Sequence, residues 1–144
     1  MWRVDETDWV RLNDERFDSC VSKNQLQVAI LDGQLVGCIN MTQVDPHTQA
    51  MSMLAVEQEH RSRGVGRFLL DSALAAAKEK GCTAVQVELL SPKDGQDPHK
   101  NFIRSWYVRK RFEFVKIIDF AEYFPESVKD LAIETVFELF EKQL

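Results

Sequence analysis

The chain has 144 residues, a formal net charge of −5 at pH 7 and three scattered cysteines. This length suits one folded domain with its own core, which we expect over residues 1–144. The acidic balance argues against a broad basic surface for nucleic acid. No apolar run approaches the roughly 20 residues of a membrane-spanning helix, and Cys20, Cys38 and Cys82 lack metal-type spacing. We therefore expect a cytoplasmic protein with free thiols, no metal and no membrane partner.

The first part of the chain predicts a helix followed by three strands. Asp5 or Thr7 caps the helix, which ends near residues 20–22. The strands are expected over residues 25–31, 34–43 and 49–56. Asp32-Gly33 is a hairpin signal between the first two strands. Because the connections are too short for parallel crossovers, the three strands predict an antiparallel meander.

Residues 51–81 predict a strand, a loop rich in arginine and glycine, and a helix that ends at Gly81. Apolar residues at Val65, Phe68 and Leu69 share one helical face. The loop, Arg61-Ser62-Arg63-Gly64-Val65-Gly66, ends where the helix begins, so its amides and the positive end of the helix dipole point to one place. The glycines allow φ values and close approach that a Cβ forbids. This combination suits a phosphate or pyrophosphate group.

The remaining chain predicts three more strands and one helix. A strand over residues 82–90 follows a helix, so it lies parallel to the strand before that helix. The later elements are a polar loop over residues 91–100, a short helix over 101–110, a strand over 112–120, a loop over 121–130 and a strand over 135–140.

This order of elements resembles the GNAT-type N-acetyltransferase superfamily. The residues that carry the resemblance are Leu54-Ala55-Val56, the loop pattern of Arg61, Gly64 and Gly66, and Tyr107 followed by Phe112. The resemblance implies an α/β (α+β) fold, with a mixed, mostly antiparallel central sheet flanked by helices and splayed at the cofactor-binding strands. The chain departs from the family pattern at Arg111, where glycine is usual, at Lys100, where asparagine is frequent, and at Ala50, where some members carry glutamate.

The resemblance implies acetyl-CoA as co-substrate and no metal. The backbone of Leu54, Ala55 and Val56 is expected to pair with its pantetheine arm. The pyrophosphate is expected to bind to the loop and the start of the helix, at Arg61, Ser62, Arg63, Gly64, Val65, Gly66 and Arg67. The side chains of Arg61 and Arg63 either reach phosphates or remain solvated. Asn101 and Tyr107 are expected to contact the cofactor from the later helix.

The implied reaction is acetyl transfer to a primary amine of a small molecule or peptide, by direct attack in a ternary complex. Tyr107 either protonates the departing thiolate or only packs in the core. Glu57 and Glu88 are candidate bases, with solvated carboxylates as the alternative. A non-catalytic acyl-CoA sensor or interaction module remains the other function class. Acceptor specificity is assigned to residues 5–24, 91–100 and 119–130, and the exposed edge of the last strands is a candidate homodimer surface.

Overall fold

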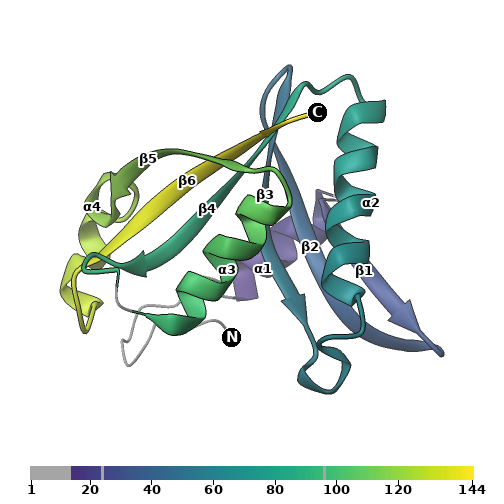
Figure 1. Cartoon of the computed structure of the whole chain (residues 1–144), viewed down its shortest axis with the longest axis horizontal. Helices are drawn as coiled ribbons and strands as arrows, with labels where there is room; N and C mark the ends of the chain where they lie inside the picture. Colours follow the sequence, from purple (N-terminus) through teal and green to yellow (C-terminus); the bar gives the residue numbers. More distant parts are fainter. Residues whose placement is uncertain (1–13, 24, 96) are drawn as a thin grey trace. The chain divides into compact units, whose positions relative to one another are not determined.

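The computed structural model describes residues 14–23, 25–95 and 97–144. Six strands form one mixed, mostly antiparallel sheet in the order β1-β2-β3-β4-β6-β5, flanked by helices (Figure 1). This confirms the predicted fold class. The elements are α1 (Asp14–Ser22), β1 (Leu26–Leu31), β2 (Gln34–Asp45), β3 (Thr48–Val56), the 3-10 helix η1 (Gln58–His60), α2 (Val65–Glu79), β4 (Ala84–Pro92), α3 (Pro98–Arg109), β5 (Glu113–Asp119), α4 (Phe120–Tyr123), the 3-10 helix η2 (Pro125–Asp130) and β6 (Thr135–Gln143).

The chain divides into two compact units, and the boundary falls inside β4, between Val87 and Glu88. Of the described residues, the first unit comprises 18–87 and 143–144, and the second comprises 14–17 and 88–142.

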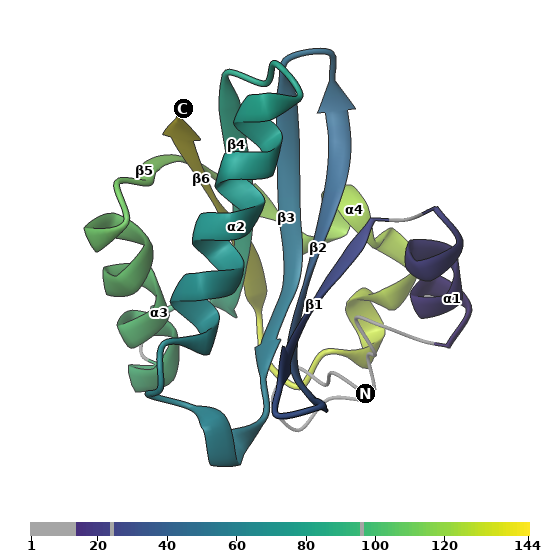
Figure 2. The same cartoon turned by 90° about the vertical axis from the view of Figure 1, so that its right-hand side faces the viewer.

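In the first unit, β1, β2 and β3 form the predicted antiparallel meander. Asp32 and Gly33 at its first turn have φ values of 51° and 78°, as a tight hairpin turn requires. Helix α2 packs along the meander, and its buried residues are Leu69, Leu70, Ala73 and Ala77 (Figure 2). The parallel pairing of β3 with β4 is also as predicted.

The close approach of α2 to the meander depends on Gly37 of β2. A Cβ at this position would lie 2.9 Å from the carbonyl oxygen of Ala55 and 3.0 Å from Cδ1 of Leu69. A backbone oxygen cannot move aside without displacing β3, so this position requires glycine.

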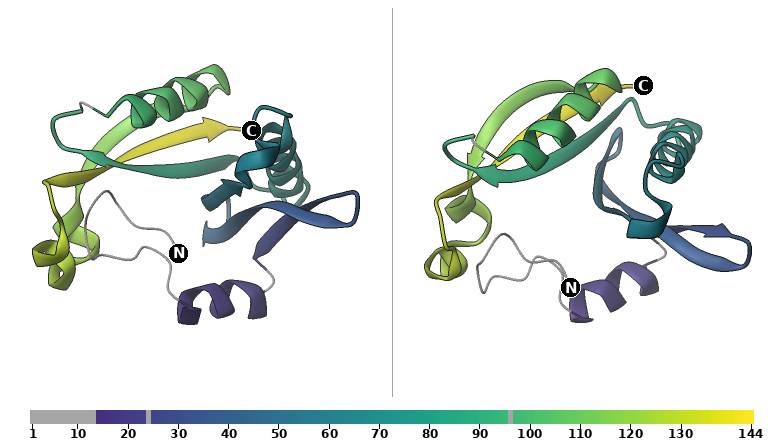
Figure 3. Two further views of the ribbon diagram at one scale, coloured as in Figure 1. Left: turned by 90° about the horizontal axis from the view of Figure 1, so that it is seen from below. Right: turned by 60° about the horizontal axis from the view of Figure 1, so that its bottom comes forward.

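In the second unit, β6 pairs antiparallel with β5, and the strand residues alternate between two faces. On one face, Leu90, Ile118, Phe120, Phe137 and Leu139 form a buried cluster with Phe124 and Leu131 packed against it. Phe120 begins α4, so α4 and η2 belong to this face. Helix α3 covers the other face (Figure 3). On that face the ring of Tyr107 contacts the ring of Phe140.

Two predictions about local structure are wrong. Helix α3 begins at Pro98 rather than at residue 101, because Asp97 caps it: Oδ1 of Asp97 accepts hydrogen bonds from the amides of His99 (2.9 Å) and Lys100 (3.1 Å). Residues 121–130, predicted as a loop, contain most of α4 and all of η2. The expected end of the first helix near residues 20–22 is confirmed by its last residue, Ser22, whereas its predicted caps at Asp5 or Thr7 lie outside the described residues.

Candidate functional site

Strand β3 leaves one edge without a ladder partner in its second half. Its pairing with β4 runs from Thr48–Ala84 to Met51–Val87, and no later pair joins the two strands in the described chain. On its other edge, β3 continues to pair with β2 through Ala55 and Val56. The register with β2 shifts near Met53, whose φ of 54° marks a bulge. The predicted pantetheine strand, Leu54–Val56, therefore presents backbone groups on the side away from β2.

The end of β3 directs one amide toward that open edge. The amide of Glu57 donates to the carbonyl oxygen of Val36 on β2 at 2.8 Å. Because successive amides of a strand point to opposite edges, the amide of Val56 points away from β2. Nε of Arg61 donates to the carbonyl oxygen of Val56 at 3.3 Å, so the loop arginine is bonded to the end of the strand.

The loop leads into a helix N-terminus that no side chain caps. Gly64 is the N-cap residue, and the first turn of α2 contains no acidic residue. The first bond within the helix runs from the amide of Phe68 to the carbonyl oxygen of Gly64, so the amides of residues 65–67 have no carbonyl one turn earlier. The exposed side chains around them are those of Arg61, Ser62, Arg63 and Arg67. Unpaired amides, the helix dipole and arginines together suit an anionic ligand.

The two glycines of the loop differ in what their backbone requires. Gly64 has a φ of 84°, which an L side chain rarely adopts. Gly66 is helical, and a Cβ there would meet only Cγ2 of Val56, at an ordinary 3.7 Å. The sequence-based expectation that the glycines supply an unusual φ holds for Gly64 but is wrong for Gly66.

Tyr107 is a buried residue of α3, only 7% exposed. Its ring centroid lies 5.6 Å from that of Trp106, 5.7 Å from that of Phe112 and 6.1 Å from that of Phe140. These contacts fix the ring against the sheet of the second unit.

Helix α3 is tied to the sheet by an ion pair that the sequence-based reasoning missed. Arg104 bonds both carboxylate oxygens of Glu138 on β6, and Ser91 Oγ of β4 donates to Glu138 Oε2 at 2.8 Å. Burial acts to raise the pKa of Glu138, but the hydrogen bonds from Arg104 and Ser91 outweigh it, and the net pKa is lowered. Nη1 of Arg104 also bonds Oδ1 of Asn101, a residue predicted to contact the cofactor.

Glu88 accepts a hydrogen bond from the hydroxyl of Tyr123 on α4, with 2.7 Å between the oxygens. Tyr123 is a second residue that the sequence-based reasoning missed, although it lies within the segment 119–130 assigned to acceptor specificity. Burial, followed by the hydrogen bond to Glu88 and the charges of Glu88 and Glu122, raises the pKa of Tyr123 to about 12.

Glu88 and Tyr107 lie on opposite faces of the second unit's sheet. On β4, Glu88 shares a face with Leu90, whose side chain belongs to the cluster on the α4 side. Ser91 has the opposite parity, and through Glu138 it is linked to Arg104 of α3. Tyr107 is on α3, so a carboxylate and a phenol flank the same strands from two sides.

Glu57 lies in the first unit, directly after β3. Its side chain is 53% exposed, and Oε2 lies 3.9 Å from Nε2 of His60. Nδ1 of His60 is buried and has no hydrogen-bond partner among the residues that the structure describes. The side chain of His60 is partly buried, at 16% exposed.

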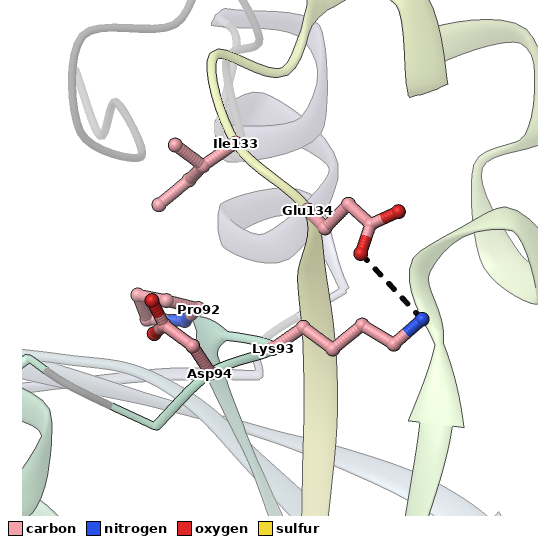
Figure 4. A pocket seen from close by; sticks show the side chains of 5 residues that line it. All are labelled: Pro92, Lys93, Asp94, Ile133 and Glu134. Carbon is pink, nitrogen blue, oxygen red and sulfur yellow. Dashed lines mark ion pairs between the residues drawn. The ribbon is translucent and has the colours of Figure 1, made fainter.

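A cavity of about 310 Å³ in the second unit is lined by Pro92, Lys93, Asp94, Ile133 and Glu134 (Figure 4). Lys93 Nζ and Glu134 Oε2 are 3.6 Å apart, and both side chains are largely exposed. Pro92, Lys93 and Asp94 belong to the segment 91–100 that was assigned to acceptor specificity, whereas none of the predicted cofactor-binding or catalytic residues lines this cavity.

The predicted site residues fall into two groups. The first unit holds Leu54–Val56, residues 61–67 and Glu57, whereas the second holds Tyr107, Asn101 and Glu88. Within the first unit, the open edge of β3 and the start of α2 are linked through Arg61. Within the second unit, Tyr107 and Asn101 share α3, and Glu88 faces α4.

The described residues hold neither a metal-binding cluster nor a membrane-spanning helix. They contain no group of three or more His, Cys, Asp or Glu residues that would hold a metal ion. They also contain no helix of the length and apolarity needed to cross a membrane.

Solved structures with the same fold include several acetyltransferases. A GNAT family acetyltransferase from Elizabethkingia anophelis, with acetyl-CoA bound, matches with a TM-score of 0.71 and 20% identity over 92% of this chain and 84% of its own. IAA acetyltransferase from Bacillus cereus matches with a TM-score of 0.70 and 19% identity, over 92% of this chain and 85% of its own. Ard1 from Thermoplasma volcanium gives a TM-score of 0.69 and 18% identity, over 92% of this chain and 80% of its own.

These identities are low, so the likeness to solved structures establishes the fold alone. No curated protein matches the chain. The family model described as Acetyltransferase (GNAT) family matches residues 2–95, more than half of the chain and including β3, the loop and α2. The chain belongs to the GNAT acetyltransferase family.

Proposed function

We propose that the protein transfers an acetyl group from acetyl-CoA to a primary amine, by direct attack of the amine in a ternary complex. The observation that carries this proposal is the pairing, in one unit, of the open edge of β3 with the uncapped start of α2. A pantetheine arm needs backbone partners, and a pyrophosphate needs positive potential. The residues present fit both needs, and Arg61 joins the two sites.

The amides of residues 65–67 and the arginines of the loop hold the pyrophosphate. The backbone of Leu54–Val56 pairs with the pantetheine arm along the edge that faces away from β2. The amide of Val56 points to the same edge, so it is the donor that polarises the thioester carbonyl. The resemblance to the family is the basis for including Asn101 and Tyr107 of α3 among the proposed cofactor contacts.

Tyr107 protonates the departing thiolate, and Glu88 accepts a proton from the amine. Acetyl transfer requires the base on the side of the nucleophile and the acid on the side of the leaving group. Glu88 and Tyr107, on opposite faces of one sheet, have this arrangement. Glu57 is the competing base, but its exposed side chain offers less control over the position of a proton acceptor.

The test begins with acetyl-CoA binding by calorimetry and CoA release against a panel of primary amines. Tyr107→Phe should lower turnover by about a hundredfold or more, the lower end of what a positioned general acid contributes, with unchanged acetyl-CoA affinity. Trp106→Phe, the neighbouring aromatic position, is the control for repacking of α3. An unchanged rate in Tyr107→Phe would remove its acid role.

Glu88→Gln and Glu57→Gln distinguish the two candidate bases, because only the substitution of the true base should lower turnover. Binding of acetyl-CoA without acetyl transfer to any amine would instead leave a non-catalytic acyl-CoA sensor on the same fold.

A further inference from the structure

We infer that Tyr123 positions the carboxylate of Glu88 for the acceptor amine. The hydroxyl of Tyr123 donates to Oε1 of Glu88, and Oε2 of Glu88 then binds a primary alkylammonium ion and takes a proton from it. This inference rests on the proposed function, since it assigns the acceptor class and a positioning residue to the same site. The hydrogen bond that carries it, between the hydroxyl of Tyr123 and Oε1 of Glu88, measures 2.7 Å.

The ring of Tyr123 is held by an aromatic cluster. Its centroid lies 5.3 Å from that of Phe137 and 6.4 Å from that of Phe124. Phe137 in turn stacks on Phe120 at 5.8 Å, with an angle of 6° between the rings, and both are at most 3% exposed. A phenol anchored in this way fixes the direction of its hydroxyl and hence the orientation of Glu88.

Tyr123 acts as a donor throughout the working pH range. Its pKa is raised to about 12, chiefly by burial and then by the hydrogen bond and charge of Glu88 and the charge of Glu122. The phenol therefore does not compete with Glu88 as a base. The other ionised pair of these strands, Arg104 with Glu138, belongs to the α3 side of the sheet.

Within the described chain, the hydrogen bond from Tyr123 is the one polar contact of the Glu88 carboxylate. Oε2 is the remaining acceptor of a half-buried carboxylate. Tyr123 remains 46% exposed, so the pair is open to ligands that approach from the α4 side. A cation that reaches Oε2 also meets the adjacent aromatic ring, an arrangement that favours ammonium ions.

The charges around the pair select the class of amine. Glu88 and Glu122 both act on Tyr123, so a carboxylate on the acceptor would be repelled. The aromatic surroundings suit an apolar stem next to the nitrogen. The acceptor is therefore a primary alkylamine without a carboxylate on the same short chain.

In the reaction, the ammonium ion gives one proton to Oε2 of Glu88 and becomes a neutral nucleophile. Its nitrogen forms a bond to the acetyl carbon while the carbon–sulfur bond breaks, and the sulfur takes a proton from Tyr107. The second proton lost by nitrogen goes to solvent, which reprotonates Tyr107. Glu88 releases its proton to solvent, so each turnover yields one net proton.

Butylamine and 4-aminobutyrate are matched probes, because a terminal methyl group in the first takes the place of the carboxylate in the second. The chain has only two tyrosines, so ring-labelled tyrosine gives an NMR spectrum that the Tyr107→Phe variant assigns. Butylammonium should shift the Tyr123 signals in the wild type and not in Glu88→Gln, and 4-aminobutyrate should shift them at least about tenfold more weakly. Glu113→Gln, an exposed charge change at the start of β5, is the control that should behave as wild type. No shift with butylammonium would overturn the inference.

Kinetics give the second readout. Tyr123→Phe keeps the ring and removes the hydroxyl, so kcat/KM for butylamine should fall by about tenfold, the effect of one net hydrogen bond. The fall should lie mainly in kcat, because butylammonium can still reach Oε2 of Glu88 whereas the carboxylate is no longer held in one orientation. Acetyl-CoA affinity should not change.

These two readouts separate the inference from the proposed function. Acetylation of butylamine with an unchanged kcat and kcat/KM in Tyr123→Phe would refute the role of Tyr123 and leave the transferase intact. Tyr123 shifts that require Glu88, without acetylation of any amine, would support the ammonium site and refute the transferase. Absence of both responses would refute both.

Discussion

The amide of Phe112 donates to the carbonyl oxygen of Tyr107 at 3.0 Å, and the two rings lie 5.7 Å apart. With the 3.0 Å bond from the amide of Arg111 to the carbonyl oxygen of Val108, this closes a Schellman motif at the end of α3. Arg111 adopts a φ of 70° within it, a conformation that glycine favours. The helix that carries Tyr107 thus ends in a complete Schellman motif, although the left-handed backbone of Arg111 is strained.

Arg111→Gly should raise the free energy of unfolding by about 1 kcal/mol, because glycine removes the strain of the left-handed backbone. Urea denaturation followed by circular dichroism measures it. Gly81→Arg is the matched control: Gly81 holds the same position in the Schellman motif of α2, with a φ of 87° and open space around its missing Cβ. This reverse change should cost about 1 kcal/mol. A loss of stability in Arg111→Gly would instead mean that the arginine side chain contributes more than the strain removes.

The sequence contains a clear signal for the end of α2 but not for the end of α3. Gly81 marked the end of α2, because glycine at this position is a strong local signal. At Arg111 the glycine was missing, and only the structure reveals that Phe112 and Tyr107 hold the same motif together. A local signal predicts an element when the residue itself sets the backbone conformation; here tertiary packing sets it.

Gly64→Ala and Gly66→Ala should have different effects although they change neighbouring glycines of one loop. Gly64→Ala places a Cβ at a φ of 84°, so it should cost about 1 kcal/mol and weaken acetyl-CoA binding. Gly66→Ala lies in a helix with an ordinary 3.7 Å contact to Val56, so stability should hold or rise by up to about 1 kcal/mol. Thermal unfolding and calorimetry with acetyl-CoA measure both. Equal losses in both variants would contradict this distinction.

The order of elements along the chain, the meander and α2 were predicted from sequence because periodicity and turn residues are local. The contacts that organise the second unit were not. Arg104 and Glu138 are 34 residues apart, and Tyr123 and Glu88 are 35 apart. Nothing in the sequence pairs these residues, since each pair is set by which faces of the sheet the two elements cover. Gly37 was missed for the same reason: its need for glycine comes from Ala55 and Leu69.

Glu138→Gln should lower the free energy of unfolding by about 2 kcal/mol at pH 7, as expected for losing charged hydrogen bonds. The pKa of Glu138 is lowered in the folded protein, so its contribution is complete above the ordinary glutamate value of 4.5 and is lost as the pH falls through the folded-state value. The difference between wild type and variant should therefore be constant from pH 7 to about pH 5 and shrink below that. Urea titrations across this range measure it.

Glu134→Gln provides the control for this dependence. Glu134 pairs with Lys93 at 3.6 Å, but the two side chains are 81% and 60% exposed, whereas those of Glu138 and Arg104 are 14% and 26% exposed. Exposed pairs contribute roughly 0–1 kcal/mol, so this variant should stay within about 0.5 kcal/mol of wild type at every pH. If Glu138→Gln behaved in the same way, the link from β6 to α3 would not be what holds the Tyr107 helix in place. A large but pH-independent loss would instead point to packing, since only an ionised Glu138 can draw on Arg104 and Ser91 together.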